Sequence, residues 1–326
     1  MPHPRFPEID GQRGFATTSQ LLAAGWTYSA LSHLVATTGS RVLPRVYLPH
    51  QSHVAVDDIT VAGWLWAGHD TALTGTRALA RHGLALTAFS PITRFLTRRN
   101  GRNRETIHGM ELRRTRRAPR ASVRDDIAVA PVERALVDAA RYKEASARDI
   151  TGWTIAALQR RLTTLDRLDA EVTASGWIGL GAVTDGCAAF RRGAWSLPEA
   201  TLGTLVAEDP RFPRMLPNPR LEDESGVLIG RPDGYFEEEG VVVQVHSRAF
   251  HDGEAPDGRD RWNATVQADN RYTAVGLAVI GVTPTALAES PTRFLDELAA
   301  TLVTHRGRAP KGVRVVLDAP PGDKSG

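Results

Sequence analysis

The residues best placed to do chemistry in this chain surround Asp233. Arg231, Pro232 and Asp233 precede a short apolar segment, and the apolar run 241–246 follows an acid-rich turn. An aspartate at the start of one strand, facing polar residues on the next, is typical of the core of a metal-dependent nuclease, in which carboxylates bind Mg²⁺. The second strand of such a core normally supplies a glutamate, and here Gln244 occupies that position.

Gln244 makes the activity of such a site an open question. Its amide oxygen can coordinate a hard cation, but it carries no charge, so a site that uses Gln244 in place of a carboxylate should bind Mg²⁺ much more weakly. Two residues later stands His246, and a histidine cannot hold a permanent positive charge as a lysine would, because an imidazole ordinarily titrates at about pH 6.5. The alternative is structural: Asp233 and Gly234 form an ordinary turn, and His246 is a hydrogen-bonded residue at the end of a strand.

Length and composition indicate a globular chain of two or three domains. It has 326 residues, of which 42% are hydrophobic and 24% charged. No stretch approaches the roughly 20 apolar residues that cross a bilayer, and residues 1–7 contain no signal-peptide core. Cys187 is the single cysteine, which excludes an internal disulfide, and because no histidine lies at zinc-ligand spacing from it we expect no zinc site. We therefore expect a cytoplasmic protein without a membrane partner.

Charge is segregated along the chain. Residues 94–124 contain eleven arginines and two acids, whereas residues 199–260 contain fourteen acids and six arginines. Codon bias in a GC-rich genome would account for the excess of arginine over lysine, but it would not account for the clustering. A basic block of this kind favours contact with a polyanion such as double-stranded DNA, and a solvated arginine-rich surface is the alternative. The candidate phosphate contacts in this block include Arg98, Arg99, Arg113 and Arg114.

The N-terminal residues predict a DNA-binding fold. A short helix from Thr18 ends at Gly25, a second helix with Thr27 as its N-cap ends at Gly39, and residues 41–49 resemble a strand pair. Helix, tight turn, helix and hairpin is the order of a winged helix-turn-helix. The alternative is a degenerate version used only for packing. The candidate base or phosphate contacts on the second helix are Tyr28, Ser29, Ser32 and His33, and those on the wing are Arg41 and Arg45.

The rest of the chain predicts an α+β architecture in further domains. We expect a basic middle α/β domain over 51–195, with helices at 59–66 and 72–84 and strands within 91–129. A last α/β domain over 196–318 should begin with a helix capped by Ser196 and continue with strands near 226–230, 233–237 and 241–246. It should end with a helix over 259–274, a buried strand over 277–282 and a helix over 291–305. The winged helix would occupy 11–50, and the tail 319–326 should be disordered.

Three segments carry a resemblance to a known family. Residues 14–25, 41–47 and 131–138 resemble the AbiEi-type antitoxins of type IV toxin–antitoxin systems in their actinobacterial form. The last domain is similar to the very-short-patch-repair endonuclease-like branch of the restriction endonuclease fold. Together the two resemblances cover most of the chain. They imply a DNA-binding autoregulator of a toxin–antitoxin operon, with an appended nuclease-like domain. The operon toxin would be of the nucleotidyltransferase type.

The resemblance also implies roles for particular residues. Glu199 matches a helical position at which the nuclease fold often carries a further acid, so the implied metal ligands are Asp233, Gln244 and Glu199, with Mg²⁺ as the cofactor of an active site. His246 and His251 correspond to histidines that this branch uses near its site, as general acid or base. Charged residues at 259–261 and 269–271 would meet phosphate or brace the site. Their alternative is a solvated helix face with i,i+4 ion pairs.

We expect a transcriptional autoregulator of the antitoxin class whose nuclease-like domain is degenerate. An active Mg²⁺-dependent DNA endonuclease targeted by the winged helix is one alternative. The other is an interaction scaffold without catalysis.

Overall fold

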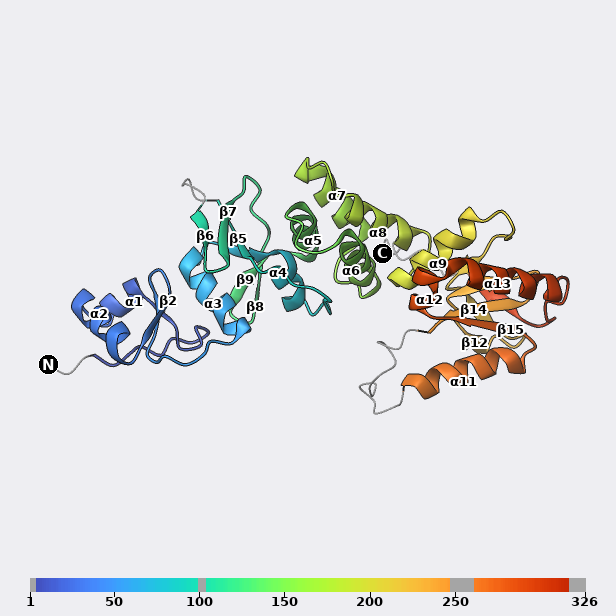
Figure 1. Cartoon of the computed structure of the whole chain (residues 1–326), viewed down its shortest axis with the longest axis horizontal. Helices are drawn as coiled ribbons and strands as arrows, with labels where there is room; N and C mark the ends of the chain where they lie inside the picture. Colours follow the sequence, from blue (N-terminus) through green and yellow to red (C-terminus); the bar gives the residue numbers. More distant parts are fainter. Residues whose placement is uncertain (1–3, 99–103, 247–260, 317–326) are drawn as a thin grey trace. The chain divides into compact units, whose positions relative to one another are not determined.

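The computed structural model describes residues 4–98, 104–246 and 261–316 (Figure 1). The chain consists of two compact units, Met1–Thr184 and Asp185–Gly326. Helices and several sheets occur along the chain, which confirms the α+β class. Within the described ranges, no helix is long and apolar enough to cross a membrane. Arg99, His251, the predicted charged residues at 259–260 and the predicted tail 319–326 lie outside the described residues.

Unit 1 begins with a small three-stranded sheet, of order β1-β3-β2, and two helices. These elements are β1 (Ala16–Thr17), α1 (Thr18–Ala23), α2 (Tyr28–Thr37), β2 (Ser40–Leu43) and β3 (Val46–Leu48). The Thr17 side chain accepts a hydrogen bond from the Gln20 amide and so caps α1, and Thr27 caps α2 in the same way, as its sequence predicts. Leu21, Leu31 and Leu34 are buried together beneath the two helices.

A six-stranded sheet with order β6-β7-β5-β4-β9-β8 forms the centre of the rest of unit 1. Its strands are β4 (Ala72–Thr74), β5 (Thr93–Thr97), β6 (Arg104–Ile107), β7 (Met110–Arg114), β8 (Ser122–Arg124) and β9 (Ile127–Val129). The helices that follow or precede them are α3 (Val56–Ala67), α4 (Gly75–Arg81), α5 (Val132–Arg141), α6 (Ala147–Gln159), α7 (Leu165–Ser175) and α8 (Gly181–Arg191), the last of which runs across the boundary between the units.

The helix predicted over 72–84 is wrong at its start. Residues Ala72–Thr74 form β4, which is fully buried and pairs with β5 on one side and β9 on the other. The chain turns at Gly75, whose φ of +69° is a left-handed conformation that favours glycine, and α4 begins there. A short apolar run in front of a helix carries no periodicity of its own, so the sequence does not separate the two elements.

Arginine side chains also form buried ion pairs inside unit 1. Arg94, on β5, donates from Nε to Glu111 Oε2 at 2.6 Å and from Nη1 to Glu144 Oε1 at 2.7 Å. The second oxygen of Glu144 accepts from the amide and hydroxyl of Thr76, in the first turn of α4. All three charged side chains are at most 10% exposed. This cluster, the Arg94–Glu111–Glu144 cluster, joins β5, β7, α4 and the segment after α5.

Unit 2 contains a four-stranded sheet of order β10-β13-β14-β15 and a smaller sheet of order β12-β11-β16. Its strands are β10 (Leu216–Pro217), β11 (Arg220–Glu222), β12 (Leu228–Gly230), β13 (Gly234–Phe236), β14 (Val241–Val245), β15 (Ala278–Val282) and β16 (Arg314–Val316). Its helices are α9 (Leu197–Glu208), α11 (Arg261–Ala274), α12 (Pro284–Glu289) and α13 (Pro291–His305). Strands β13 and β14 are antiparallel, and β14 and β15 are parallel.

The alternation of side chains along β14 decides which helix each residue meets. Val241 and Val243 belong to a core formed with α9, α12 and α13, whereas Val242 belongs to the opposite core, formed with α11. Figure 1 shows α13 and α11 on opposite sides of this sheet. Gln244, two residues after Val242, therefore lies on the α11 side.

Candidate functional site

Asp233 and Gln244 lie side by side in unit 2, as the sequence predicts. Asp233 immediately precedes β13, and the antiparallel register pairs Gly234 with Val243 on β14. The Val245 amide donates to Asp233 Oδ2 at 2.6 Å, and the Asp233 amide donates to Gln244 Oε1 at 3.3 Å. These two contacts fasten the Asp233 side chain against the end of β14.

Two residues of α11 complete this cluster. Asp269 and Tyr272 are one turn apart and both hydrogen-bond with the Gln244 side chain. His246 Nε2 lies 3.4 Å from Asp269 Oδ2. Gly281 on β15 is paired in register with Gln244, and a Cβ on Gly281 would lie 2.8 Å from the His246 ring, so a larger residue there would displace that ring. We call Asp233, Gln244, His246, Asp269 and Tyr272 the Asp233 cluster.

Burial changes the protonation of both carboxyl groups. It raises the pKa of Asp233 to about 7, with a further contribution from the negative charge of Glu199 and a smaller one from Asp269, while the Val245 N–H acts in the opposite direction. Burial also raises the pKa of Asp269, and His246 and Gln244 partly offset that shift. The Asp269 Oδ1 atom is buried and has no hydrogen-bond partner in the described part of the chain.

Glu199 is positioned by the start of α9 and not by the Asp233 cluster. Its Oε1 accepts from the Ser196 hydroxyl at 2.6 Å, which completes a cap at the helix N-terminus. Its Oε2 accepts from the Trp195 amide at 2.8 Å and from Asn218 Nδ2 at 2.7 Å. The carboxylate is near enough for its charge to raise the pKa of Asp233, but its oxygens already serve the cap.

The oxygens of the Asp233 cluster are of the kind that Mg²⁺ prefers. Asp233 has one carboxylate oxygen beyond the bond to Val245, and Asp269 Oδ1 is unpartnered within the described ranges. Gln244 Oε1 is already engaged by the Asp233 amide. Among the described residues, no group of three histidine, cysteine or acidic side chains is arranged to hold a metal ion. The donor types therefore fit Mg²⁺, and the described arrangement requires side-chain movement before three of them converge.

Sequence reasoning did not assign Asn218 or Tyr272 to this site and left Asp269 between two interpretations. The spacing of Asp269 and Tyr272 places both on one helix face, which was a usable signal. Asn218 carries no such signal, because it lies in the loop after β10 and reaches Glu199 only through the fold.

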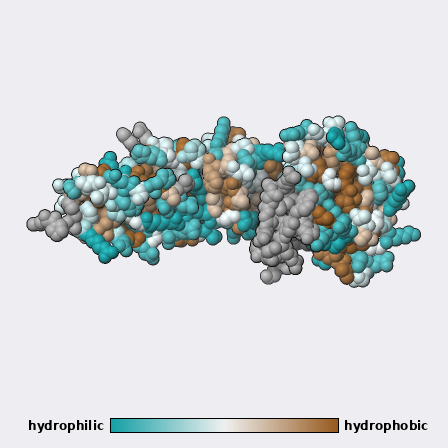
Figure 2. All heavy atoms as spheres, turned by 60° about the horizontal axis from the view of Figure 1, so that its bottom comes forward, coloured by the Kyte–Doolittle hydropathy of each residue, from teal (hydrophilic) through white to brown (hydrophobic). Residues whose placement is uncertain are grey.

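The second candidate site is the exposed face of α2 in unit 1. Tyr28 is 70% exposed, and Ser29, Ser32 and His33 are exposed beside it. Ala30, Leu31 and Leu34 form the buried face of the same helix. Figure 2 shows that hydrophilic residues cover most of the visible surface of the N-terminal elements, on the left of that view.

The β2–β3 hairpin places its two arginines in solvent. Arg41 lies on β2 and Arg45 in the turn, where its φ is +68°. The Arg45 carbonyl accepts a hydrogen bond from the Thr18 amide at 2.9 Å, which ties this turn to the first residue of α1.

The arginine block is only partly a surface feature. Arg98 and Arg114 are exposed, whereas Arg113 bonds to Glu111 at 2.6 Å and lies 5.4 Å from the centre of the Tyr142 ring. Arg117 forms a double hydrogen bond with Glu171 at 3.0 and 2.7 Å. Arg94 is internal, as described above. The charge count of residues 94–124 therefore overstates the positive surface of unit 1.

Comparison with protein-family models and with curated proteins gives no match for this chain.

Proposed function

We propose that the protein is a DNA-binding transcriptional autoregulator of the type IV antitoxin class, with a degenerate nuclease-like domain in unit 2. The observation that carries the proposal is the exposed polar face of α2, which follows α1 after a tight turn and precedes a hairpin with two exposed arginines. This order of elements supports a winged helix-turn-helix. Its helix α2 would read base edges, and Arg41 and Arg45 would contact phosphates.

The composition of α2 shapes the expected binding. The helix contains no arginine or lysine, so sequence discrimination would come from the hydroxyls of Tyr28, Ser29 and Ser32 and from His33. Affinity would come mainly from phosphate contacts of Arg41, Arg45, Arg98 and Arg114. Few such contacts predict a shallow dependence of binding on salt. In the antitoxin class the regulated operon also encodes a toxin of the nucleotidyltransferase type, and this regulation requires no direct contact with the toxin.

A mobility shift tests the proposal on the DNA upstream of the protein's own reading frame, with a scrambled duplex of equal length beside it. Arg45→Gln should weaken binding to both duplexes and reduce the slope of log affinity against log salt by about 1. Ser29→Ala should instead reduce the preference for the upstream DNA, because a serine hydroxyl at a base edge contributes to discrimination.

The matched control is Arg167→Gln, which removes an exposed arginine on α7. This variant should bind as the wild type does. Loss of binding in the control as well, or no salt-sensitive binding by the wild-type protein, contradicts the proposal and leaves the scaffold interpretation.

For unit 2, the order of elements supports a restriction-endonuclease-like fold: a helix, antiparallel strands β13 and β14, helix α11, and β15 parallel to β14. A residual Mg²⁺-dependent nuclease is the second candidate function. It is favoured by the arrangement of Asp233 beside Gln244, with the unpartnered Asp269 Oδ1 in the same cluster. Its weakness is the neutral Gln244, since phosphodiester hydrolysis by Mg²⁺ relies on carboxylate ligands.

Plasmid nicking with Mg²⁺ or Mn²⁺ separates the two interpretations of unit 2. A degenerate site predicts no cleavage by the wild-type protein and cleavage by Gln244→Glu, which restores a carboxylate at the end of β14. An active enzyme predicts cleavage by the wild type that Asp233→Ala abolishes. Cleavage that survives in Asp233→Ala would show that this cluster is not the source of activity.

A further inference from the structure

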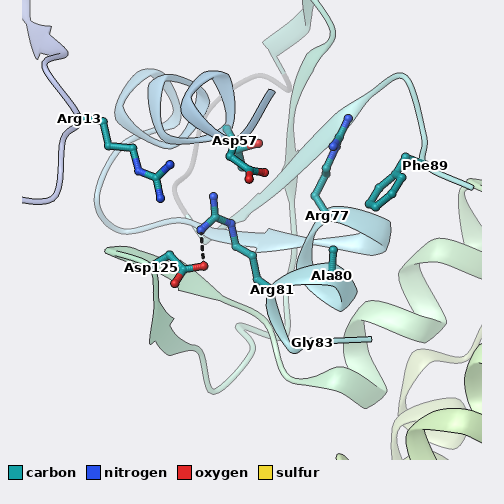
Figure 3. A pocket seen from close by; sticks show the side chains of 9 residues that line it. Arg13, Asp57, Arg77, Ala80, Arg81, Gly83, Phe89 and Asp125 are labelled. Carbon is teal, nitrogen blue, oxygen red and sulfur yellow. Dashed lines mark hydrogen bonds and ion pairs between the residues drawn. The ribbon is translucent and has the colours of Figure 1, made fainter. Parts of the chain in front are cut away.

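A pocket of about 260 Å³ opens in unit 1, and the proposed function does not use it. Its lining comes from the loop before β1, the start of α3, helix α4, the loop that follows α4 and the β8–β9 turn (Figure 3). Three of its lining side chains are arginines, two are aspartates and one is an exposed phenylalanine. These residues are Arg13, Arg77, Arg81, Asp57, Asp125 and Phe89.

Two of the arginines are paired with carboxylates that a stronger anion can replace. Arg81 Nη1 lies 3.0 Å from Asp125 Oδ2, and Arg13 Nη1 lies 2.8 Å from Asp58 Oδ1. The aspartate side chains are 62% and 36% exposed, so solvent screens both pairs and weakens them. The Arg81 side chain is only 8% exposed and is therefore held in place by its surroundings. A phosphate dianion with two hydrogen-bond acceptors per guanidinium is a better partner for both arginines.

Arg77 and Phe89 offer a different kind of contact. The Arg77 Nε atom is buried and has no hydrogen-bond partner among the described residues. Its guanidinium group lies 4.8 Å from the centre of the Phe89 ring, and Phe89 is 45% exposed. A buried donor without an acceptor costs free energy, and an exposed ring beside it can stack on another flat ring. The pair therefore suits a planar group that stacks on the exposed Phe89 ring.

Asp57 restricts the class of ligand that the pocket can bind. In Figure 3 the side chains of Arg13 and Arg81 extend toward the same space as the exposed Asp57 carboxylate. A carboxylate repels a bare inorganic anion, but it accepts hydrogen bonds from hydroxyl groups. A ligand that satisfies all these groups has a phosphate, hydroxyls and a planar ring.

We propose that this pocket binds a nucleoside monophosphate. The phosphate lies between Arg13 and Arg81, the ribose hydroxyls donate to Asp57, and the base lies against Phe89 and Arg77. The pocket volume is slightly below the roughly 300–1,000 Å³ of typical small-molecule sites. We therefore expect a ligand no larger than a nucleoside monophosphate. The proposal does not depend on DNA binding by α2.

Calorimetric titration of the full-length protein with AMP, inorganic phosphate and adenosine tests this assignment. AMP should bind at least tenfold more tightly than phosphate or adenosine, because only AMP engages the arginines, Asp57 and the ring together. Phe89→Ala should weaken AMP binding by a factor of about 5–10 and leave phosphate binding unchanged. Asp57→Asn should weaken AMP binding and strengthen phosphate binding, because it removes the repelling charge. Both residues are exposed, so these variants should fold.

Arg81→Gln should abolish AMP binding, and Arg167→Gln, which lies on α7, is the matched control that should not. The proposal is overturned if the protein binds AMP and phosphate with equal affinity. It is also overturned if the protein binds neither ligand. A third contrary outcome is that AMP does not bind but Arg81→Gln weakens the retention of duplex DNA. That result would assign the arginines to backbone phosphates.

Discussion

At the scale of residues, Gln244 is a physically reasonable occupant of the Asp233 cluster. The negative charges of Glu199 and Asp269 are close enough to raise the pKa of Asp233. A neutral amide accepts a hydrogen bond from the Asp233 N–H through its oxygen and donates through its nitrogen to Asp269. A glutamate here would add another negative charge, which only a bound cation compensates. Gln244 therefore suits a cluster that is stable without a metal.

The raised pKa of Asp233 predicts how stability depends on pH. An unfolded aspartate has a pKa of about 3.9, and the native value is about 7. The native state retains this proton over a range in which the unfolded state loses it, so stability falls as pH rises from about 4 to about 7. Asp233→Asn keeps an acceptor for the Val245 N–H and removes the charge. It should therefore gain about 2–4 kcal/mol over the wild type between pH 4 and pH 8.

Urea unfolding at several pH values measures this difference. Asp223→Asn is the control with the opposite sign, because hydrogen bonds from Ser225 and Val227 lower the pKa of Asp223 and its charged form stabilises the native state. The Asp223→Asn variant should show no gain at high pH. If Asp233→Asn follows the wild-type pH profile, the carboxyl group is not protonated in the native protein.

Some of this cluster could be predicted and some could not. Asp233 and Gln244 flank one hairpin, so the antiparallel register of neighbouring strands is enough to bring them together. Asp269 and Asn218 reach the site from a helix and a loop, and their positions depend on how these elements pack. Local sequence does not determine such packing, because the contacts that fix it are distant in the chain.

At the scale of elements, the start of α4 illustrates how a buried contact fixes a boundary. Gly75 has a left-handed φ of +69°, and a Cβ on this residue would overlap the Glu144 carboxylate. Glu144 accepts hydrogen bonds from Thr76 in the first turn of α4, so the helix begins where this carboxylate can cap it. The sequence contains both residues, but nothing in it indicates that they meet.

Replacement of Gly75 by alanine should destabilise unit 1 by about 2–4 kcal/mol, because it adds backbone strain and displaces the carboxylate that Arg94 needs. Gly83, just after the other end of α4, also has a left-handed φ of +79°, but a Cβ there meets nothing within 4 Å. Gly83→Ala should therefore cost only about 1 kcal/mol, from strain alone. Thermal unfolding of the two variants measures the difference, and equal losses would rule out a specific role for Glu144.

At the scale of the whole molecule, the sequence predicted the class of the fold and many elements, but it misjudged how charge is used. The α+β class, the N-caps Thr27 and Ser196 and the helix over 291–305 are confirmed. These features depend on local patterns of apolar spacing and capping. The division into a winged helix, a middle domain and a nuclease-like domain stays a prediction. The sequence led us to place the whole arginine block on the surface, because composition does not distinguish an exposed guanidinium from one enclosed by carboxylates.

The Arg94–Glu111–Glu144 cluster also has a consequence for synthesis of the protein on the ribosome. Arg94 and Glu111 leave the exit tunnel well before Glu144, so Arg94 lacks one of its two carboxylate partners for as long as translation of the intervening residues takes. The same applies permanently to any fragment that stops between β9 and Glu144. A gene fragment that includes β5 must therefore extend past Glu144 if Arg94 is to keep both of its carboxylate partners.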